Sequence, residues 1–345
     1  MEQRRKNSKR GHASLAGIIL RDGLVFVLCL VGAVIAIAGA GAPKKAAAMS
    51  QETGTQVASL AAETTSPTES TSTPLITPEP EQTPEPTAAP TATPEPASAS
   101  GDFSAAFPAQ DTGAGALLSY QTDSLRIAIT KQEAYGATYF VADVWVKNID
   151  AFRAAFAKDA YGRGLHEMPL DIANRANAVF AVSGDYYGAR ESGVVVRNGT
   201  LYRDVMGDDV CVLRTDGTLQ IYRKGSFSAL ENIDKTVWQA WAFGPALVED
   251  GKASDTSQSK IKVKNPRSAI GYYEPGHYCF IVVDGRQSGY SDGMTLDELA
   301  GTFASLGCTA AYNLDGGATA MMVFQGALVN HPTNGGRTSS DIIYF

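Results

Sequence analysis

Cysteine is scarce in this chain of 345 residues, which contains only four. Four cysteines do not make a disulfide scaffold, and Cys29 lies in an apolar stretch near the N-terminus. The other three, Cys211, Cys279 and Cys308, cannot all pair with one another. The sequence allows one disulfide among them without assigning it. We expect them to be small apolar core residues, with Cys279 on a buried strand in "HYCFIVV".

Histidine is equally scarce, and the patterns of common metal and nucleotide sites are missing. The four histidines show no H-E-x-x-H spacing, and there are no paired cysteine ligands, which argues against a zinc site. The glycine-rich stretches lack the lysine of a P-loop.

The chain also lacks an excess of positive charge. Its formal net charge is -7 and its pI is about 5.2. A general nucleic-acid-binding protein needs a basic face to neutralise phosphates, so this class is disfavoured. The acidic balance still leaves room for a local basic pocket that binds one anionic group.

Near the N-terminus, residues 23–42 form an uncharged apolar run of about the length that spans a bilayer. The preceding residues 1–22 are rich in Arg and Lys, so the positive-inside rule predicts a cytoplasmic tail and a single-pass signal anchor in the plasma membrane. The alternative is a cleaved signal peptide, because "AGAGA" offers small residues for a peptidase. Both interpretations export the rest of the chain.

Residues 43–119 have the composition of a disordered linker. The tetrapeptide Thr-Pro-Glu-Pro occurs at 77–80, 83–86 and 93–96, among Thr, Ser, Ala and Glu. Such a segment has too little apolar surface to offset the entropy of ordering, and its prolines remove backbone donors. We therefore expect an extended spacer between the membrane and a folded domain.

Residues 120–345 are globular in composition, and we expect one strand-rich α+β domain with a few helices. Asn198-Gly199 and Asp216-Gly217 each indicate a hairpin. The predicted strands are 125–130, 138–147, 179–183, 193–203 and 211–223 as hairpins, 267–273, 277–283 and 310–314.

Three helices are predicted in this domain. They cover 148–162 with Asp150 as N-cap, 170–178, and 295–308, where Thr295 and Glu298 form a capping-box pattern. The last helix links the strand ending at Val283 to the strand ending at Leu314, and we expect these strands to be parallel neighbours.

Polar residues gather at the ends of the apolar strands. Three are aspartates and three are arginines: Asp185, Asp284, Asp315, Arg267, Arg286 and Arg337. A single Asp-Gly is most often a turn. Asp315, however, is followed by both Gly316 and Gly317, whose open N–H groups would suit an anion. Forked guanidinium groups are suited to phosphate, so a phosphate site is predicted here.

Several of these motifs together resemble those of the phosphodiester glycosidase family. The resemblance covers roughly 170–345 and rests on "FGPALVEDGK", "NPRSAIG", "FIVVDGRQSGYSDGM", "NLDGGATAMMV" and "VNHPTNGGRTSS", in this order. One departure is that Ser183-Gly184 stands before Asp185, where the family usually has Asn-Gly.

The resemblance implies hydrolysis of the bond between a sugar's anomeric carbon and a phosphodiester. Such a reaction needs a carboxylate near the developing anomeric cation. We assign this role to Asp315, assisted by Asp185 or Asp284. The arginines and the amides of Gly316 and Gly317 would hold the phosphate, and Asn313 would orient sugar hydroxyls.

The function predicted from the sequence is therefore that of a membrane-anchored extracellular hydrolase acting on a glycosyl-1-phosphodiester, in a cell-wall polymer or an exopolysaccharide. No cofactor is implied, although the aspartates leave room for a divalent metal. The alternative is a non-catalytic carbohydrate-binding or envelope-assembly module on the same fold. The sequence specifies neither the sugar nor its aglycone.

Overall fold

The computed structural model describes residues 101–109, 115–229 and 236–345. The predicted cytoplasmic tail, the signal anchor and nearly all of the linker lie outside these residues. Within the described ranges, no helix is long and apolar enough to cross a membrane.

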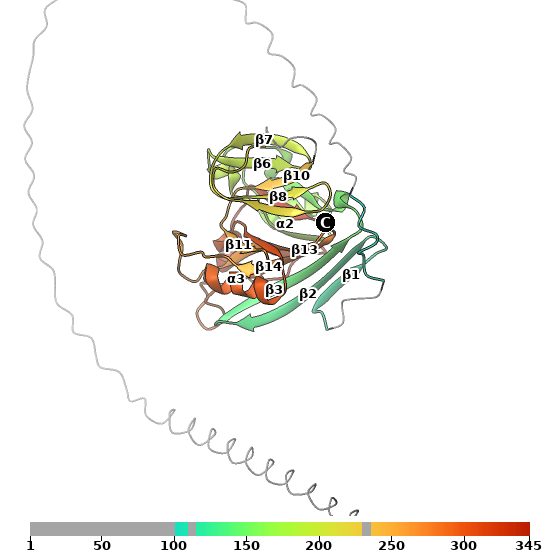
Figure 1. Cartoon of the computed structure of the whole chain (residues 1–345). Coiled ribbons are helices and arrows are strands. Elements are labelled where there is room, and N and C mark those ends of the chain that lie inside the picture. The colour runs from blue at the N-terminus through green and yellow to red at the C-terminus, as the bar shows by residue number, and fades with distance from the viewer. Residues whose placement is uncertain (1–100, 110–114, 230–235) are drawn as a thin grey trace, which may run out of the picture. The chain divides into compact units, whose positions relative to one another are not determined.

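Three antiparallel sheets make up most of the described structure (Figure 1). The eight-stranded sheet has the order β1 (Leu118–Gln121), β2 (Leu125–Ala134), β3 (Ala137–Val146), β14 (His277–Val283), β13 (Arg267–Glu274), β15 (Ala310–Asn313), β11 (Ala246–Glu249), β12 (Lys252–Ala253). A five-stranded sheet has the order β7 (Thr200–Val205), β6 (Gly193–Arg197), β10 (Val237–Trp241), β8 (Val210–Arg214), β9 (Leu219–Tyr222). The third, also five-stranded, has the order β17 (Ala327–Leu328), β16 (Met322–Phe324), β5 (Phe180–Ser183), β18 (Asp341–Tyr344), β4 (Arg153–Phe156).

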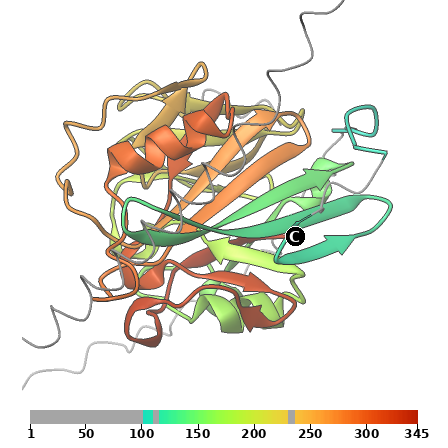
Figure 2. The same cartoon turned by 90° about the horizontal axis from the view of Figure 1, so that it is seen from below.

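Helices are few among the described residues, as expected for a strand-rich domain. They are the α-helices α2 (Pro169–Arg175) and α3 (Leu296–Ser305) and the short 3₁₀ helices η1 (Ile149–Ala151), η2 (Ala157–Asp159), η3 (Tyr187–Ala189), η4 (Gly317–Thr319) and η5 (Thr333–Gly335). Figure 2 shows α2 in green and α3 in orange-red on opposite sides of the strands. The sequence correctly predicted α3, whose capping box joins Thr295 and Glu298 in both directions. The apolar side of α3 packs on the eight-stranded sheet against residues such as Ile281.

Local turn chemistry explains the predicted hairpin at Asn198-Gly199 and a further hairpin at Tyr135-Gly136. The hairpin predicted at Asp216-Gly217 also forms, between β8 and β9. Tyr135-Gly136 and Asn198-Gly199 have positive φ at both positions, which matches the twist of the flanking strands and favours glycine and asparagine. These turns connect β2 to β3 and β6 to β7.

The predicted helix at 148–162 is wrong. The segment forms η1, β4 and η2, and the cap of η1 is Asn148, whose side chain accepts from the Asp150 N–H. The reason is tertiary, because β4 pairs with β18 at the far end of the chain. Phe152, which is fully buried, packs against Trp241, Tyr278 and Phe345. Pairing and burial override the helical pattern of the sequence.

The prediction that the strands before and after α3 are parallel neighbours is also wrong. The strands β14 and β15 run in the same direction, but β13 lies between them and pairs antiparallel with both. The helix α3 therefore crosses over one strand, and Arg267 at the start of β13 comes to lie between the ends of β14 and β15.

The packed structure extends to the N-terminal side of residue 120. The strand β1 begins at Leu118, and Phe103 is only 7% exposed within the largest core cluster. Its backbone N–H donates to Lys147 O. The three cysteines in the described residues are buried, as predicted, and Cys279 lies on β14.

Candidate active site

The ends of three adjacent strands converge at one edge of the eight-stranded sheet. Arg267 begins β13 and is paired with Val283, the last residue of β14. Asn313, the last residue of β15, is paired with Ala269 on the other side of β13. The antiparallel register thus brings Asp284, Arg267 and Asp315 to the same edge.

A cavity of about 1040 Å³ opens beside this edge. It is lined by seven of the nine predicted site residues: Arg267, Arg286, Asn313, Asp315, Gly316, Gly317 and Arg337. Asp185 and Asp284 do not line it. The roles assigned to all nine residues stay predictions.

Asp315 is a carboxylate that its surroundings leave partly unsatisfied. Its side chain is 3% exposed, and Oδ2 has no hydrogen-bond partner. Oδ1 lies 3.9 Å from Nη2 of Arg337. Burial raises the pKa of Asp315 to about 7, against the lowering effects of Thr319 and Arg337. Near neutral pH this group can exchange a proton.

Asn313, which lines the same cavity, carries a second buried acceptor without a partner. Its Nδ2 donates to Gly244 O over 2.8 Å, which fixes the orientation of the amide. Its Oδ1 is buried and has no hydrogen-bond partner. Buried acceptors without partners are uncommon in folded proteins, and two of them in one cavity point to a ligand that donates hydrogen bonds.

Arg267 and Arg286 are two guanidinium groups without a carboxylate partner among the described residues. Arg267 is 5% exposed and donates only to the carbonyl oxygens of Met294 and Val263. Arg286 donates twice to Oδ1 of Asn265, over 3.0 and 2.6 Å. Burial, together with the charge of Arg286, lowers the pKa of Arg267 to about 10. Two uncompensated cations beside one cavity are suited to an anion.

The Gly316-Gly317 turn packs against the backbone instead of offering two open amides. The Gly317 N–H donates to Pro266 O over 2.9 Å, so this amide already has a backbone partner, and its role in holding a phosphate stays a prediction. A Cβ at Gly316 would lie 2.8 Å from the same carbonyl oxygen. Gly317 has a φ of +66°, which also favours glycine. The two glycines let the turn approach the start of β13 closely.

Asp284 organises loops behind the cavity. Its carboxylate accepts from Tyr290 Oη, Asn330 Nδ2 and the His331 N–H. Burial raises its pKa, whereas these hydrogen bonds act in the opposite direction. The neighbouring Ser291 falls in a Gly-x-Ser-x-Gly pattern at 289–293, but its Oγ is buried and donates to Asp284 O. This serine is therefore held in the loop and is not an exposed nucleophile.

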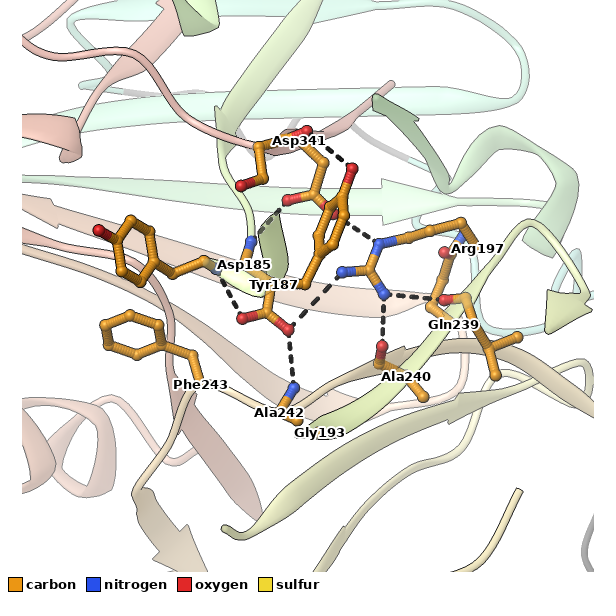
Figure 3. A network of polar contacts seen from close by, with 12 residues as sticks. Asp185, Tyr187, Gly193, Arg197, Gln239, Ala240, Ala242, Phe243 and Asp341 are labelled. Atoms are coloured by element: carbon orange, nitrogen blue, oxygen red, sulfur yellow. Dashed lines mark hydrogen bonds and ion pairs between the residues drawn. The ribbon is translucent and has the colours of Figure 1, made fainter. Parts of the chain in front are cut away.

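Asp185 belongs to a buried ion cluster with Arg197 and Asp341 (Figure 3). Its Oδ1 accepts from the Tyr186 N–H, and its Oδ2 accepts from the Ala242 N–H. Arg197 donates through Nε to Asp341 over 2.6 Å and lies 3.7 Å from Asp185. Burial raises the pKa of Asp341 to about 6, and Arg197 opposes this rise. Asp185 thus has its acceptors occupied, and its charge raises the pKa of Asp315.

Ser183, the departure from the family pattern, points away from the cavity. Its Oγ donates to Thr319 O and accepts from the Met321 N–H. The side chain is fully buried and joins β5 to the turn after β15.

The cavity is also lined by residues that the sequence alone did not single out, among them Tyr186, Arg190 and Phe243. The guanidinium of Arg190 lies 4.8 Å from the ring centre of Phe243, and that of Arg337 lies 5.7 Å from the ring centre of Tyr186. The signal available for Tyr186 was its place directly after Asp185. Phe243 stands at the start of a quoted motif, but nothing local shows that its ring faces a cavity.

A metal site finds little support in this arrangement. Within the described ranges, no group of three or more His, Cys, Asp or Glu side chains is placed to hold an ion. Of the three predicted aspartates, only Asp315 lines the cavity.

Comparisons with known proteins agree with this geometry. The model of the phosphodiester glycosidase family matches residues 176–345. A curated relative, the SPbeta prophage-derived uncharacterized protein YomE of Bacillus subtilis (strain 168), is 32% identical over 242 residues. This match covers 62% of the chain but only 37% of the relative's length.

Two solved structures share the fold. The zebrafish N-acetylglucosamine-1-phosphodiester alpha-N-acetylglucosaminidase catalytic domain, auto-inhibited by its pro-peptide, matches with a TM-score of 0.52 and 19% identity, over 71% of this chain and 94% of that one. A hypothetical protein from Synechocystis matches with a TM-score of 0.53 and 14% identity, over 67% and 64% of the two chains. These two structures show the fold, and the family model identifies residues 176–345 of this chain as a phosphodiester glycosidase domain.

Proposed function

We propose that this protein hydrolyses the bond between the anomeric carbon and the phosphate of a glycosyl-1-phosphodiester. One observation carries the proposal. Asn313 and Asp315 each carry a buried acceptor without a partner, and they line the same cavity as Arg267 and Arg286, which lack carboxylate partners among the described residues. Family membership supports the same reaction class.

Each half of such a substrate has a counterpart in the cavity. The phosphodiester is an anion whose oxygens accept hydrogen bonds, and Arg267 and Arg286 supply two positive charges beside the cavity. The sugar hydroxyls donate hydrogen bonds, which Asn313 Oδ1 lacks. Tyr186 and Phe243 offer ring faces and edges against which the apolar side of a sugar can pack.

The chemistry follows from the leaving group. A phosphomonoester leaves readily and needs little protonation, so the main cost is positive charge at the anomeric carbon. In its ionised form, Asp315 stabilises that charge, by electrostatic contact or by attack on the carbon. The weak ion pair with Arg337, at 3.9 Å, leaves the carboxylate available for this role.

Isotope-labelled hydrolysis tests the proposal. The full-length protein, kept in mild detergent, is incubated with a panel of sugar-1-phosphodiesters in ¹⁸O-labelled water. Free sugar and phosphomonoester are expected in equal amounts, with no ¹⁸O in the phosphomonoester, because the C–O bond breaks. Asp315→Asn should be slower by about a hundredfold or more, whereas Asp123→Asn, a change at an exposed carboxylate outside the cavity, should not differ from wild type.

Two outcomes would contradict the proposal. Label in the phosphomonoester would identify attack at phosphorus, as in a phosphodiesterase. Saturable binding of the glycans without turnover would instead favour the non-catalytic carbohydrate-binding module.

We further propose that the domain acts outside the cell, attached to the plasma membrane, on a wall polymer or an exopolysaccharide. The apolar run at 23–42, with basic residues on its N-terminal side, supports this topology. Protease added to intact cells should release the domain by cleaving the linker. Protection of the domain, with the wall shown to admit the protease, would contradict it.

A further inference from the structure

Two of the cysteines meet in the core beneath α3. Cys279 lies on β14, and Cys308 lies shortly after the end of α3. Both are fully buried, and their Sγ atoms are 3.6 Å apart. This separation is a direct contact between two sulfur atoms that are 29 positions apart in the sequence.

The contact depends on a glycine in the strand between them. Gly271 on β13 is paired with Cys279 in the sheet register. A Cβ at this position would lie 2.8 Å from the Sγ of Cys308 and 2.7 Å from the ring of Phe303. Because the glycine has no side chain, Cys308 can reach across β13 to Cys279.

Cys211 has no place in this pair. It lies on β8 in a different sheet, and it belongs to a different core cluster from Cys279 and Cys308. The structure thus separates three thiols that the sequence could not tell apart.

We propose that Cys279 and Cys308 form a disulfide bond. A disulfide has an S–S distance of about 2.05 Å, so the sulfur atoms need to approach by about 1.5 Å. The segment that carries Cys308 can supply this movement, because its neighbours Gly307 and Thr309 are exposed at the end of a helix. The predicted export would place the pair in an oxidising environment.

The chemistry requires an external disulfide as oxidant, either a small-molecule disulfide such as oxidised glutathione or a protein disulfide. Cys308 as thiolate attacks one sulfur of the oxidant, forms a mixed disulfide and releases one thiolate. Cys279 then attacks the Sγ of Cys308 and releases the second. Two thiols lose two protons and two electrons, and the oxidant is reduced to two thiols.

The bond would stabilise the fold without altering the cavity. Leu296 at the N-terminal end of α3 lines the cavity, whereas Cys308 lies beyond the helix's other end. Cys279 likewise precedes the end of β14 by four residues. The bond would join α3 to the sheet and constrain the unfolded chain, as disulfides generally do. This inference rests on the proposed export of the domain but not on the proposed reaction.

The test begins with the oxidised protein. Full-length protein carrying Cys29→Ala is refolded in a glutathione redox buffer, alkylated under denaturing conditions and digested. A peptide pair linking Cys279 to Cys308 is expected, about 2 Da lighter than the two reduced peptides, with Cys211 alkylated. Alkylation of both Cys279 and Cys308 in protein that has refolded, or a linkage to Cys211, would overturn the proposal.

Thermal unfolding provides the second measurement. Reductant should lower the melting temperature by about 5 °C or more, since the loop that the bond closes is long. The double variant Cys279→Ala/Cys308→Ala should show no such shift, whereas Cys211→Ala should retain it. Equal sensitivity to reductant in the double variant and in wild type would contradict the bond. Turnover, where it is found, should be the same in both redox states.

Discussion

At the scale of single residues, the candidate site is defined by which polar groups the fold leaves unsatisfied. Asp185 and Asp284 are as deeply buried as Asp315, but each has its oxygen atoms occupied by N–H or O–H donors. Asp315 keeps an acceptor without a partner and a pKa raised to about 7 by burial. A fold gains no stability from such a group, which is typical of a functional position.

The pH dependence of activity should report the ionisation of Asp315. Because the ionised form is the one that stabilises a cation, kcat/KM should rise between about pH 5 and pH 8, with a midpoint near the pKa of this group. In Asp315→Asn, activity should fall by about a hundredfold or more and the midpoint should disappear. Rates measured across this range provide the check. A wild-type rate that falls with rising pH would identify Asp315 as an acid instead.

The stability of the fold should also depend on the ionisation of Asp315, and Asp315→Asn should gain stability at the pH at which it loses activity. Asp315 has a higher pKa in the folded protein than its ordinary value of 3.8, so the folded state binds its proton more tightly. Its contribution to stability is present below about pH 4 and is lost as the pH rises to about 7. Asp315→Asn should therefore be the more stable protein at about pH 8, by on the order of 1–4 kcal/mol, with a smaller gain at about pH 4. Urea unfolding at both pH values measures this, and Asp123→Asn should show neither effect.

The substitution Arg267→Lys tests whether the site needs only a positive charge at this position or also the forked shape of the guanidinium group. The substitution keeps a cation but loses the fork that bonds Met294 O and Val263 O and reaches the cavity. Binding of a phosphodiester should weaken by about tenfold or more, whereas binding of the free sugar should change little. Calorimetric titration with both ligands checks this. An equal loss for the two ligands would assign Arg267 to the support of the fold.

At the scale of elements, the site depends on strands that are distant in sequence. The strand β13 brings Arg267 between the ends of β14 and β15, and β5 brings Asp185 beneath them. The Asp315 N–H donates to Gly184 O over 3.0 Å, which joins the two sheets at this point. The ion cluster of Arg197, Asp185 and Asp341 then ties β6 to the turn after β5 and to β18.

Arg197 should therefore matter for folding. Arg197→Met removes the only cation that this cluster has among the described residues and leaves two buried carboxylates without compensation. The expected loss of stability is about 3–5 kcal/mol, measured by urea unfolding. Arg163→Met is a matched control, because Arg163 pairs with Glu191 at the surface and its loss should cost less than about 1 kcal/mol. Similar losses of stability in both variants would mean that the buried cluster stabilises the fold no more than a surface ion pair does.

At the scale of the whole molecule, the packed structure includes residues 101–109, which the sequence composition had placed in the disordered linker. Phe103 is buried against Gly217 and Gly276, where a Cβ would lie within 2.6 Å of its side chain. Phe107, by contrast, is half-buried and lies against Arg126 and Lys147.

Phe103→Ala should destabilise the protein by about 3–5 kcal/mol, as expected for a buried phenylalanine. Phe107→Ala should cost clearly less. A fragment that begins at residue 115 should likewise unfold at lower urea concentration than one that begins at residue 101. If the two fragments unfold together, the segment 101–109 contributes nothing to the fold.

The sequence by itself determined the features that depend on neighbouring residues. The turn at Asn198-Gly199 follows from two residues that tolerate positive φ. The helix α3 follows from its cap and its apolar stripe. The family motifs also identified seven residues of the cavity, because they stand at strand ends.

Tertiary structure decided the rest. Residues 153–156 form a strand and not part of an α-helix because β18, nearly two hundred positions later, offers a pairing edge. Contacts between segments far apart in the chain distinguish Asp315 from Asp185 and Asp284, because only the latter two have all their oxygen atoms occupied. Such contacts also bring Cys279 next to Cys308. Whether a buried polar group finds a partner is a property of the packed structure, since the partner comes from another element. No local pattern of residues encodes it.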